Sequence, residues 1–180
     1  LHWDAQDECL IAGSTCEADC RSAKPEEEIC VFAKIDVKTL QVIACCDTPE
    51  GTYLAAVLGS VGHGKYLVSC ISECAHNPTL EIEGKRWTKL FVLDTKTMSL
   101  QECFAEEQML YTPENVFFTG KEGLFVLRSG DVFSLVRWDN AFIVLHEIAA
   151  CKNCIKVHVQ DHELYLVSGE KIYIHTLEKP

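Results

Sequence analysis

The chain has 180 residues, of which 48% are hydrophobic, so it can bury a sizeable core as one large domain or two small ones. Its formal net charge of −11 at pH 7 disfavours binding to phosphate backbones unless a local basic patch opposes it. No apolar run reaches the ~18 residues of a membrane-spanning helix, so no membrane span is predicted.

Short β-type runs separated by turn residues fill the chain from end to end. Val, Ile, Phe, Tyr and Thr are abundant in these runs, and no helical stripe lasts three turns, so an all-β fold is predicted. In chain order, the fourteen predicted strands read ECLIAGS, EICVFAKID, LQVIACC, YLAAVLGSV, KYLVSCIS, KLFVLDT, SLQECFA, NVFFTG, GLFVLRSG, DVFSLVRWD, AFIVLHEIA, CIKVHVQ, ELYLVSG and KIYIHTLE.

An Asp-led turn recurs between neighbouring predicted strands. Asp36 and Asp94 each begin the pattern Asp-x-Lys-Thr, and Asp139 opens a third, shorter version. A carboxylate at this place can accept a hydrogen bond from a backbone N–H two residues further on, which favours a tight turn. An antiparallel unit that repeats every forty to sixty residues or so is typical of a β-propeller blade.

The sequence Arg137-Trp138-Asp139 resembles the Trp-Asp pair that closes the third strand of a WD40 repeat. The other two copies, KID and VLD, keep the Asp alone, so the resemblance implies a WD40-like β-propeller with diverged repeats. The Gly62-His63 pair falls between the first and second strands of its blade, where the family does not place its Gly-His. The order strand, acidic loop, strand in LIAGST…EEEICVFAKID…LQVIA more weakly resembles the propellers of the DNA-damage-binding and cleavage-factor scaffolds, over the first half of the chain.

The strand count predicts four-stranded antiparallel blades, about three and a half of them, in segments of roughly 1–47, 48–105, 106–150 and 151–180. Closed propellers typically contain 4–8 blades. Either LHWD at the start adds a strand to a small ring, or the chain is part of a larger ring. We favour the second interpretation, with the remaining blades supplied by the same longer protein or by another subunit. The start LHWDAQDE also lacks the features of a signal peptide.

Two long insertions, Thr15 to Glu28 and Glu73 to Thr88, separate the second and third predicted strands of successive blades. Because their positions are equivalent, we expect both to project from one face of the ring. The second insertion ends in EGKRWTK, where Lys85, Arg86 and Lys89 surround Trp87. Arg and Trp are enriched at binding hot spots, so these four residues are the predicted partner-binding site. Alternatively, Trp87 begins the following strand and packs in the blade.

Eleven cysteines, an odd number, favour free thiols in a reducing compartment, the cytoplasm or the nucleus. Cys151, Cys154 and His158 have the spacing of a zinc knuckle, but a single such pair is a weak signal, so no metal is predicted. The alternative is that both cysteines start a buried strand. Further candidate ligands beside the long loops are Cys16, Cys20, Cys70, Cys74 and His76.

Neither Gly-x-Ser-x-Gly nor His-Glu-x-x-His occurs, and the glycine-rich segments GSVGHG and TGKEG are predicted to be turns between strands. We therefore expect neither an enzyme nor a cofactor. The expected function is a protein-interaction scaffold in a multi-subunit complex. The alternative is a nucleic-acid-associated factor of DNA repair or RNA processing that uses the Lys85, Arg86, Trp87 and Lys89 patch.

Overall fold

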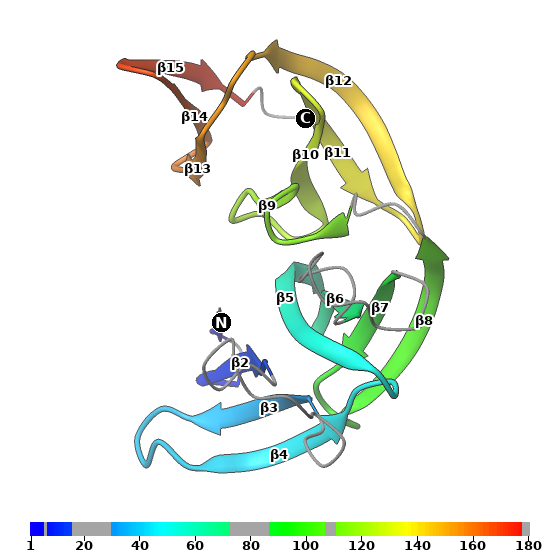
Figure 1. Cartoon of the computed structure of the whole chain (residues 1–180). Coiled ribbons are helices and arrows are strands. Elements are labelled where there is room, and N and C mark those ends of the chain that lie inside the picture. Colours follow the sequence, from blue (N-terminus) through cyan, green and yellow to red (C-terminus); the bar gives the residue numbers. More distant parts are fainter. Residues whose placement is uncertain (6, 16–29, 73–86, 107–110, 178–180) are drawn as a thin grey trace.

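The computed structural model describes residues 1–5, 7–15, 30–72, 87–106 and 111–177. Within these residues, fifteen strands form four antiparallel sheets whose strand order follows the sequence (Figure 1). The first sheet contains β1 (His2–Asp4), β2 (Cys9–Gly13), β3 (Val31–Asp36) and β4 (Val42–Asp47), and the second contains β5 (Thr52–Gly62), β6 (Lys65–Ser72), β7 (Thr88–Asp94) and β8 (Ser99–Glu106). The third contains β9 (Val116–Phe118), β10 (Leu124–Ser129), β11 (Val132–Trp138) and β12 (Phe142–Ala150), and the fourth contains β13 (Lys156–Gln160), β14 (Glu163–Ser168) and β15 (Lys171–Thr176).

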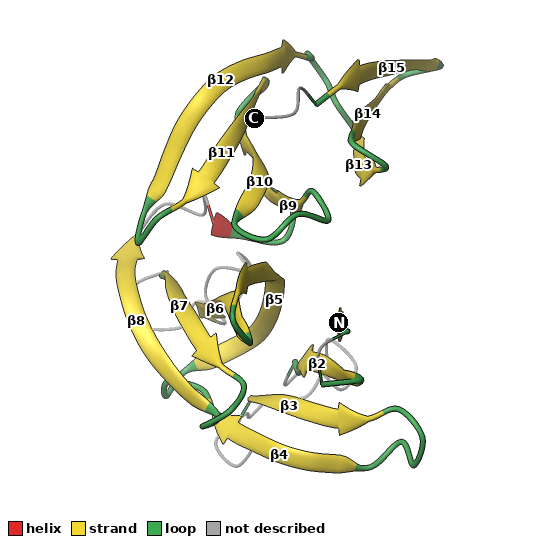
Figure 2. Ribbon diagram, turned by 180° about the vertical axis from the view of Figure 1, so that it is seen from behind, coloured by secondary structure: helices red, strands yellow, loops and turns green. Residues whose placement is uncertain are grey.

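The four sheets are the blades of a β-propeller arrangement, as the strand rhythm predicted. All fourteen predicted strands are present, and strands dominate the described chain (Figure 2). The fifteenth strand, β1, comes from LHWD and completes the first blade, so three blades have four strands and the last has three. LHWD therefore supplies the extra strand that was one of the two interpretations, and its three residues are too few to show an alternation in the sequence. In the described part of the chain, no helix could cross a membrane.

The blades follow one another along an open arc (Figure 1). Successive blades contact each other through inner strands: β2 contacts β5, β5 contacts β9, and β9 contacts β13. Backbone hydrogen bonds also cross from blade to blade. The Ala55 N–H donates to the Ser14 carbonyl at 2.9 Å, and the Gly123 N–H donates to the Ser60 carbonyl at 2.9 Å.

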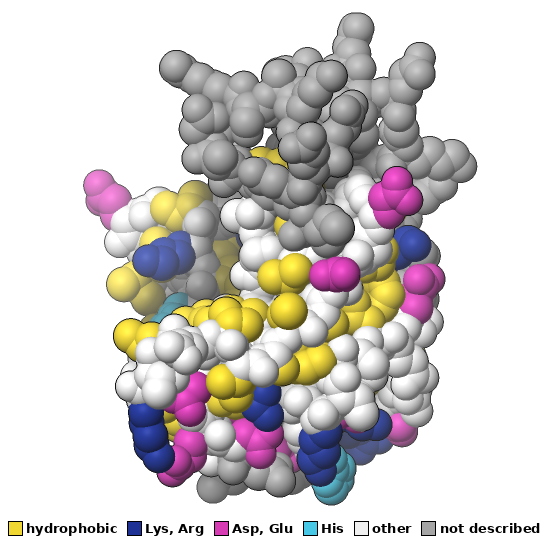
Figure 3. Space-filling view, turned by 90° about the horizontal axis from the view of Figure 1, so that it is seen from below, with side chains coloured by type: hydrophobic (Ala, Val, Ile, Leu, Met, Phe, Trp, Pro, Cys, Tyr) yellow, Lys and Arg dark blue, Asp and Glu magenta, His cyan; other side chains and the backbone are white. Residues whose placement is uncertain are grey.

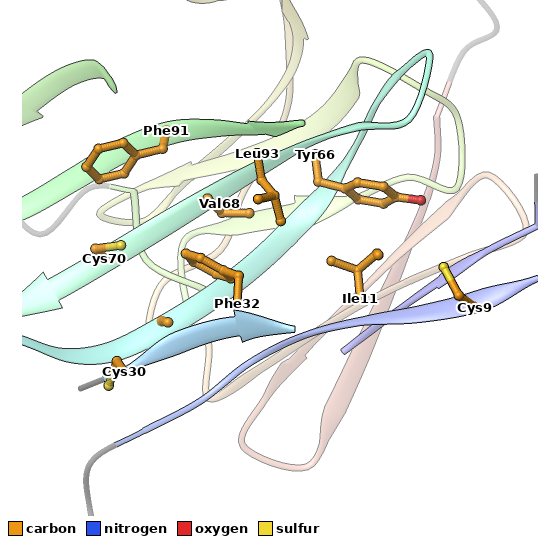
Figure 4. Close-up of a cluster of buried hydrophobic side chains, with 10 residues drawn as sticks. Cys9, Ile11, Cys30, Phe32, Tyr66, Val68, Cys70, Phe91 and Leu93 are labelled. Carbon is orange, nitrogen blue, oxygen red and sulfur yellow. The ribbon is translucent and has the colours of Figure 1, made fainter. Parts of the chain in front are cut away.

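The hydrophobic core lies between blades, because a single sheet has no interior of its own. Figure 4 shows the cluster between the first two blades, where Ile11 and Phe32 of one sheet meet Val68 and Leu93 of the next. Two equivalent clusters lie between the second and third blades and between the third and fourth. Strand β6 is buried on both faces for this reason: Val68 belongs to the first cluster and its neighbour Leu67 to the next.

Two glycines allow the blades to approach closely. A Cβ atom added at Gly13 would lie 2.1 Å from the carbonyl oxygen of Ala55 in the second blade. A Cβ atom added at Gly59 would lie 2.5 Å from the ring of Phe118 in the third. Such distances are far below van der Waals contact, so both positions require glycine at the present spacing of the blades.

The repeated Asp-x-Lys-Thr pattern forms the hairpin between the third and fourth strands. Asp36 Oδ1 accepts the N–H groups of Lys38 and Thr39 at 2.9 and 2.8 Å and the Thr39 hydroxyl at 3.0 Å. Asp94 Oδ1 accepts the corresponding N–H groups of Lys96 and Thr97 at 2.9 and 3.3 Å. These hydrogen bonds lower the pKa of both carboxyl groups. The largest contribution comes from the Thr39 backbone N–H at Asp36 and from the Lys96 backbone N–H at Asp94. The third copy is tighter: the Asp139 N–H donates to the Ala141 carbonyl at 2.9 Å.

Gly59→Ala should destabilise the protein by about 1–3 kcal/mol, because the new methyl group overpacks the contact between the second and third blades. Urea denaturation measures the change. A smaller side chain at the contact, in the double variant Gly59→Ala with Phe118→Leu, should recover part of the loss. If the double variant were destabilised by the sum of the losses in the two single variants, the Gly59–Phe118 contact would not set the spacing of the blades.

Asp36→Ala should destabilise the protein more at neutral than at acidic pH. The native pKa of Asp36 is lowered, so the stabilisation is complete above the unfolded value of about 3.9 and disappears as the pH falls through the native value. Urea midpoints measured from pH 7 to pH 2.5 should therefore converge for the wild type and the variant. Asp36→Asn, which keeps one acceptor oxygen, is the matched control and should destabilise the protein less than Asp36→Ala at pH 7. If the stability difference between the wild type and Asp36→Ala did not change with pH, the proposed link to the ionisation of Asp36 would be wrong.

Candidate interaction surfaces

The last blade has one face turned away from the third blade, and that face carries exposed hydrophobic side chains. Ile172 and Ile174 of β15 are 64% and 57% exposed. Their cross-strand partners on β14 are Val167 and Tyr165, which lie on the same face and are half-buried. The opposite face contributes Leu164 and Leu166 to the core with the third blade. The outward face is therefore a hydrophobic surface of the kind that the other blades bury.

Comparison with the other third strands makes the difference clear. Strands β7 and β11 occupy the same place in their sheets as β15, and their side chains that face the next blade, Leu90 on β7 and Phe133 and Leu135 on β11, are almost completely buried. In β15, four consecutive residues from Lys171 to Ile174 are exposed. Strand β15 lacks both a fourth strand beside it and a neighbouring blade over its outward face among the described residues.

The first blade also has an outward face. Trp3 on β1 pairs with Leu10, which pairs with Ile35 on β3, and Ile35 pairs with Val42 on β4, so these side chains share one face across the sheet. Trp3 and Val42 are exposed, and Leu10 and Ile35 are half-buried. Figure 3, viewed from below Figure 1, where the first blade lies, shows rows of hydrophobic side chains with charged side chains gathered at the lower margin.

Of the four residues in the predicted partner-binding patch, Lys85 and Arg86 lie outside the described residues. Trp87 directly precedes β7, its N–H donates to the Ser72 hydroxyl at 3.0 Å, and its ring packs against the core of the first two blades. Lys89 lies on β7, with its ammonium 5.4 Å from the centre of the Trp87 ring and 3.7 Å from Glu102. Both described members of the patch thus have contacts within their own blade.

The two predicted insertions follow the second strands of adjacent blades, after β2 and after β6. Residues 16–29 and 73–86 lie outside the described residues. Thr15, at the start of the first insertion, forms an isolated antiparallel bridge with Leu54 of the second blade.

The candidate zinc ligands are placed as follows. Cys151 and Cys154 are buried in the core between the third and fourth blades, and the Cys154 thiol lies 3.3 Å from the Lys156 carbonyl. His158 is exposed on β13 and contacts Gln160 at 3.2 Å. Cys70 is buried in the first cluster. Cys16, Cys20, Cys74 and His76 lie outside the described residues. No group of three His, Cys, Asp or Glu that could hold a metal occurs among the residues that are described.

A pocket of about 210 Å³ opens at the inner side of the arc, where three blades meet. Its walls come from β1 and the residue after it, from the ends of β5 and β6, and from the β9–β10 hairpin. The lining residues are His2, Trp3, Asp4, Ala5, Ser60, Gly64, Tyr66, Phe118, Gly120 and Glu122. The sequence did not predict this pocket, because its residues come from three separate segments of the chain and one of them, β1, is too short to show an alternation.

The pocket combines carboxylates with aromatic rings. The Asp4 carboxylate, only 4% exposed, accepts the Asp7 N–H at 3.2 Å and a hydrogen bond from the Tyr66 hydroxyl. The His2 ring packs edge-on against Tyr66 and Phe118, with ring centres 5.1 and 5.0 Å apart. Burial lowers the pKa of His2 and, together with Asp4, raises that of Tyr66. Both side chains are therefore neutral at pH 7 and add no formal charge to the pocket.

Comparisons with known proteins show similarity to solved structures and to no family model or curated protein. No protein-family model matches the chain, and no curated protein matches it. A solved structure described as KlHsv2 with loop 6CD replaced by a Gly-Ser linker is similar over 83% of this chain, with a TM-score of 0.49 and 14% sequence identity. This chain covers 44% of that structure, so it spans less than half of its length. The assignment of the propeller fold rests on the sheet order above.

Brief alkylation of the native protein should modify Cys45 first, because it is the exposed thiol among the described cysteines. The buried thiols Cys70 and Cys151 should react only after unfolding: burial raises the pKa of Cys70 to about 12 and also raises that of Cys151, and the thiolate is the reactive form. Peptide mapping by mass spectrometry measures the order, with urea-unfolded protein as the control. Equal rates at Cys45 and Cys151 in the native state would contradict the buried position of Cys151.

Proposed function

We propose that the chain is a non-enzymatic interaction scaffold, part of a β-propeller that packs its terminal blades against protein partners within a larger assembly. The observation that supports this proposal is the exposed hydrophobic face of the last blade around Ile172 and Ile174. The equivalent faces of the earlier blades are covered by the next sheet. Exposed hydrophobic patches and open sheet edges promote association, so a cover for this face is expected.

The partner that fits such a face is another β-sheet with a hydrophobic face. In the described blades, sheet faces pack through hydrophobic side chains such as Phe32 and Val68, and glycines at the contact bring the sheets close together. A further blade would repeat this contact on either terminal face. The remaining blades would come from the same longer protein or from another subunit, in the cytoplasm or the nucleus, where free thiols such as Cys45 persist.

The alternative function, binding of nucleic acid through the Lys85, Arg86, Trp87 and Lys89 patch, has less support. Lys89 is close to Glu102, which offsets its charge, and Trp87 packs against its own blade. The net charge of −11 opposes binding to a polyanion.

The proposal predicts that the 180-residue chain self-associates through its terminal faces in the absence of partners. Ile174→Lys places a charge in the last-blade face and should shift the protein towards the monomer, as measured by sedimentation velocity across a concentration series. Val144→Lys is the matched control: Val144 is 61% exposed on the outer strand β12, so the same change there should leave association unaltered. A wild-type chain that stays monomeric and melts cooperatively at all concentrations would refute the proposal.

A further inference from the structure

We propose that strand β15 pairs edge to edge with β15 of a second copy of this chain, antiparallel to it and related by a twofold axis at Ile174. The inference rests on the proposed function, because it names the contact through which the last blade associates. In the other three sheets a fourth strand lies beside the third, whereas β15 is the outer edge of its sheet in the part of the chain that is described (Figure 1). A strand of the second copy would take the place of the fourth strand.

Strand β15 is more regular than the outer strands of the other blades. The outer strands β4, β8 and β12 each pair with the third strand of their blade through a register that is shifted by at least one β-bulge or irregularity. Strand β15 pairs with β14 over six consecutive residue pairs without a shift. Because bulges twist an edge away from other chains, β15 is the outer strand best suited to accept a further strand.

The side chains of β15 also favour strand pairing. Each of β4, β8 and β12 contains at least one Asp or Glu, whereas β15 contains neither, and its one lysine, Lys171, lies at its start. Charged side chains on an edge strand oppose pairing with another strand. The exposed side chains of Ile172 and Ile174 are β-branched and hydrophobic, which is the type that strand pairing favours. The edge of β15 thus lacks the features by which the other outer strands avoid association.

The backbone groups that would form the new ladder follow from the pairing of β15 with β14. The Leu177 N–H donates to the His162 carbonyl at 2.7 Å, in the same register as the strands. Bonded and non-bonded pairs alternate along an antiparallel ladder, so the N–H and C=O groups of Ile172, Ile174 and Thr176 point away from β14. These three residues therefore present donors and acceptors at the open edge.

A twofold axis at Ile174 makes the two edges complementary. The axis places Ile174 opposite Ile174 of the second copy, and Ile172 opposite Thr176 of that copy. At each of these positions a residue whose backbone groups point outward faces another such residue, as an antiparallel ladder requires. Tyr173 would lie opposite His175 of the second copy on the other side of the sheet. The isoleucines of both copies would then lie side by side, in the self-complementary contact that is typical of twofold dimers.

Hydrogen exchange in the 180-residue protein, followed by NMR, tests the ladder. At a concentration at which the protein associates, the N–H groups of Ile172, Ile174 and Thr176 should exchange about tenfold more slowly than in the dilute monomer. The N–H groups of Tyr173 and His175, which face β14, are the internal control and should change little. Association without this alternating protection would overturn the strand pairing and leave the proposed function standing, whereas a protein that stays monomeric would overturn both.

A proline at the edge tests the same hydrogen bonds by mutation. Thr176→Pro removes an N–H group that faces away from β14, and proline is tolerated at such positions of an edge strand. The variant should associate about tenfold more weakly in sedimentation velocity, while Thr176→Val, which keeps the N–H group, should associate like the wild type. Thermal melts confirm that both variants are folded. Equal association of the two variants would show that the edge of β15 is not the contact.

A mixed sample of carbon-13-labelled and unlabelled protein determines the register. Non-bonded pairs of an antiparallel ladder bring their Cα atoms to about 4.5 Å, so the Hα atoms of Tyr173 and of His175 in the second copy should give a filtered NOE. This NOE would support the twofold pairing at Ile174. Its absence from protein that associates would overturn the pairing.

Discussion

The packing of one blade face on the next is the contact on which the rest of this structure depends. A twisted four-stranded sheet has two faces and no interior, so its hydrophobic side chains are buried only when another sheet lies against them. The three core clusters are all of this kind, and strand β6 is buried on both faces because it lies between two neighbours. Gly13 and Gly59 are necessary at the contacts because any side chain would hold the sheets apart.

The same requirement explains the hydrophobic surface at each end of the arc. A stack of sheets always leaves two outer faces, and here these faces carry Ile172 and Ile174 at one end and Trp3 and Val42 at the other. Leu164 and Leu166, on the inner face of the last blade, are fully buried by comparison. The chemistry of the outward residues resembles that of the inner faces, which is why a further sheet is the most suitable partner for them. The proposal of an interaction scaffold rests on these exposed faces and not on any motif in the sequence.

The inner end of the arc has a different chemistry from the terminal faces. There the first strand, a hairpin of the second blade and a hairpin of the third bring two carboxylates and several aromatic rings around one pocket. A carboxylate as buried as Asp4 is costly unless hydrogen bonds compensate, and Tyr66 and the Asp7 N–H provide them. The described blades therefore present two different surfaces: hydrophobic sheet faces at the ends of the arc and a polar pocket at its inner side.

Local patterns determined most of the fold. Alternating hydrophobic residues predicted fourteen strands, and Asp36 and Asp94 identified the hairpins because an Asp turn depends only on residues within the next three positions. The strand rhythm likewise placed the long insertions after β2 and β6, at equivalent positions in successive blades. Long-range packing decided the rest. It depends on which blades come together that β1 completes a sheet, that Trp87 is partly buried and that Cys151 and Cys154 are buried. The pocket lined by Asp4, Tyr66 and Glu122 depends on the same contacts. No local pattern in a sequence encodes a contact between residues sixty or more positions apart, so only the tertiary structure could show these features.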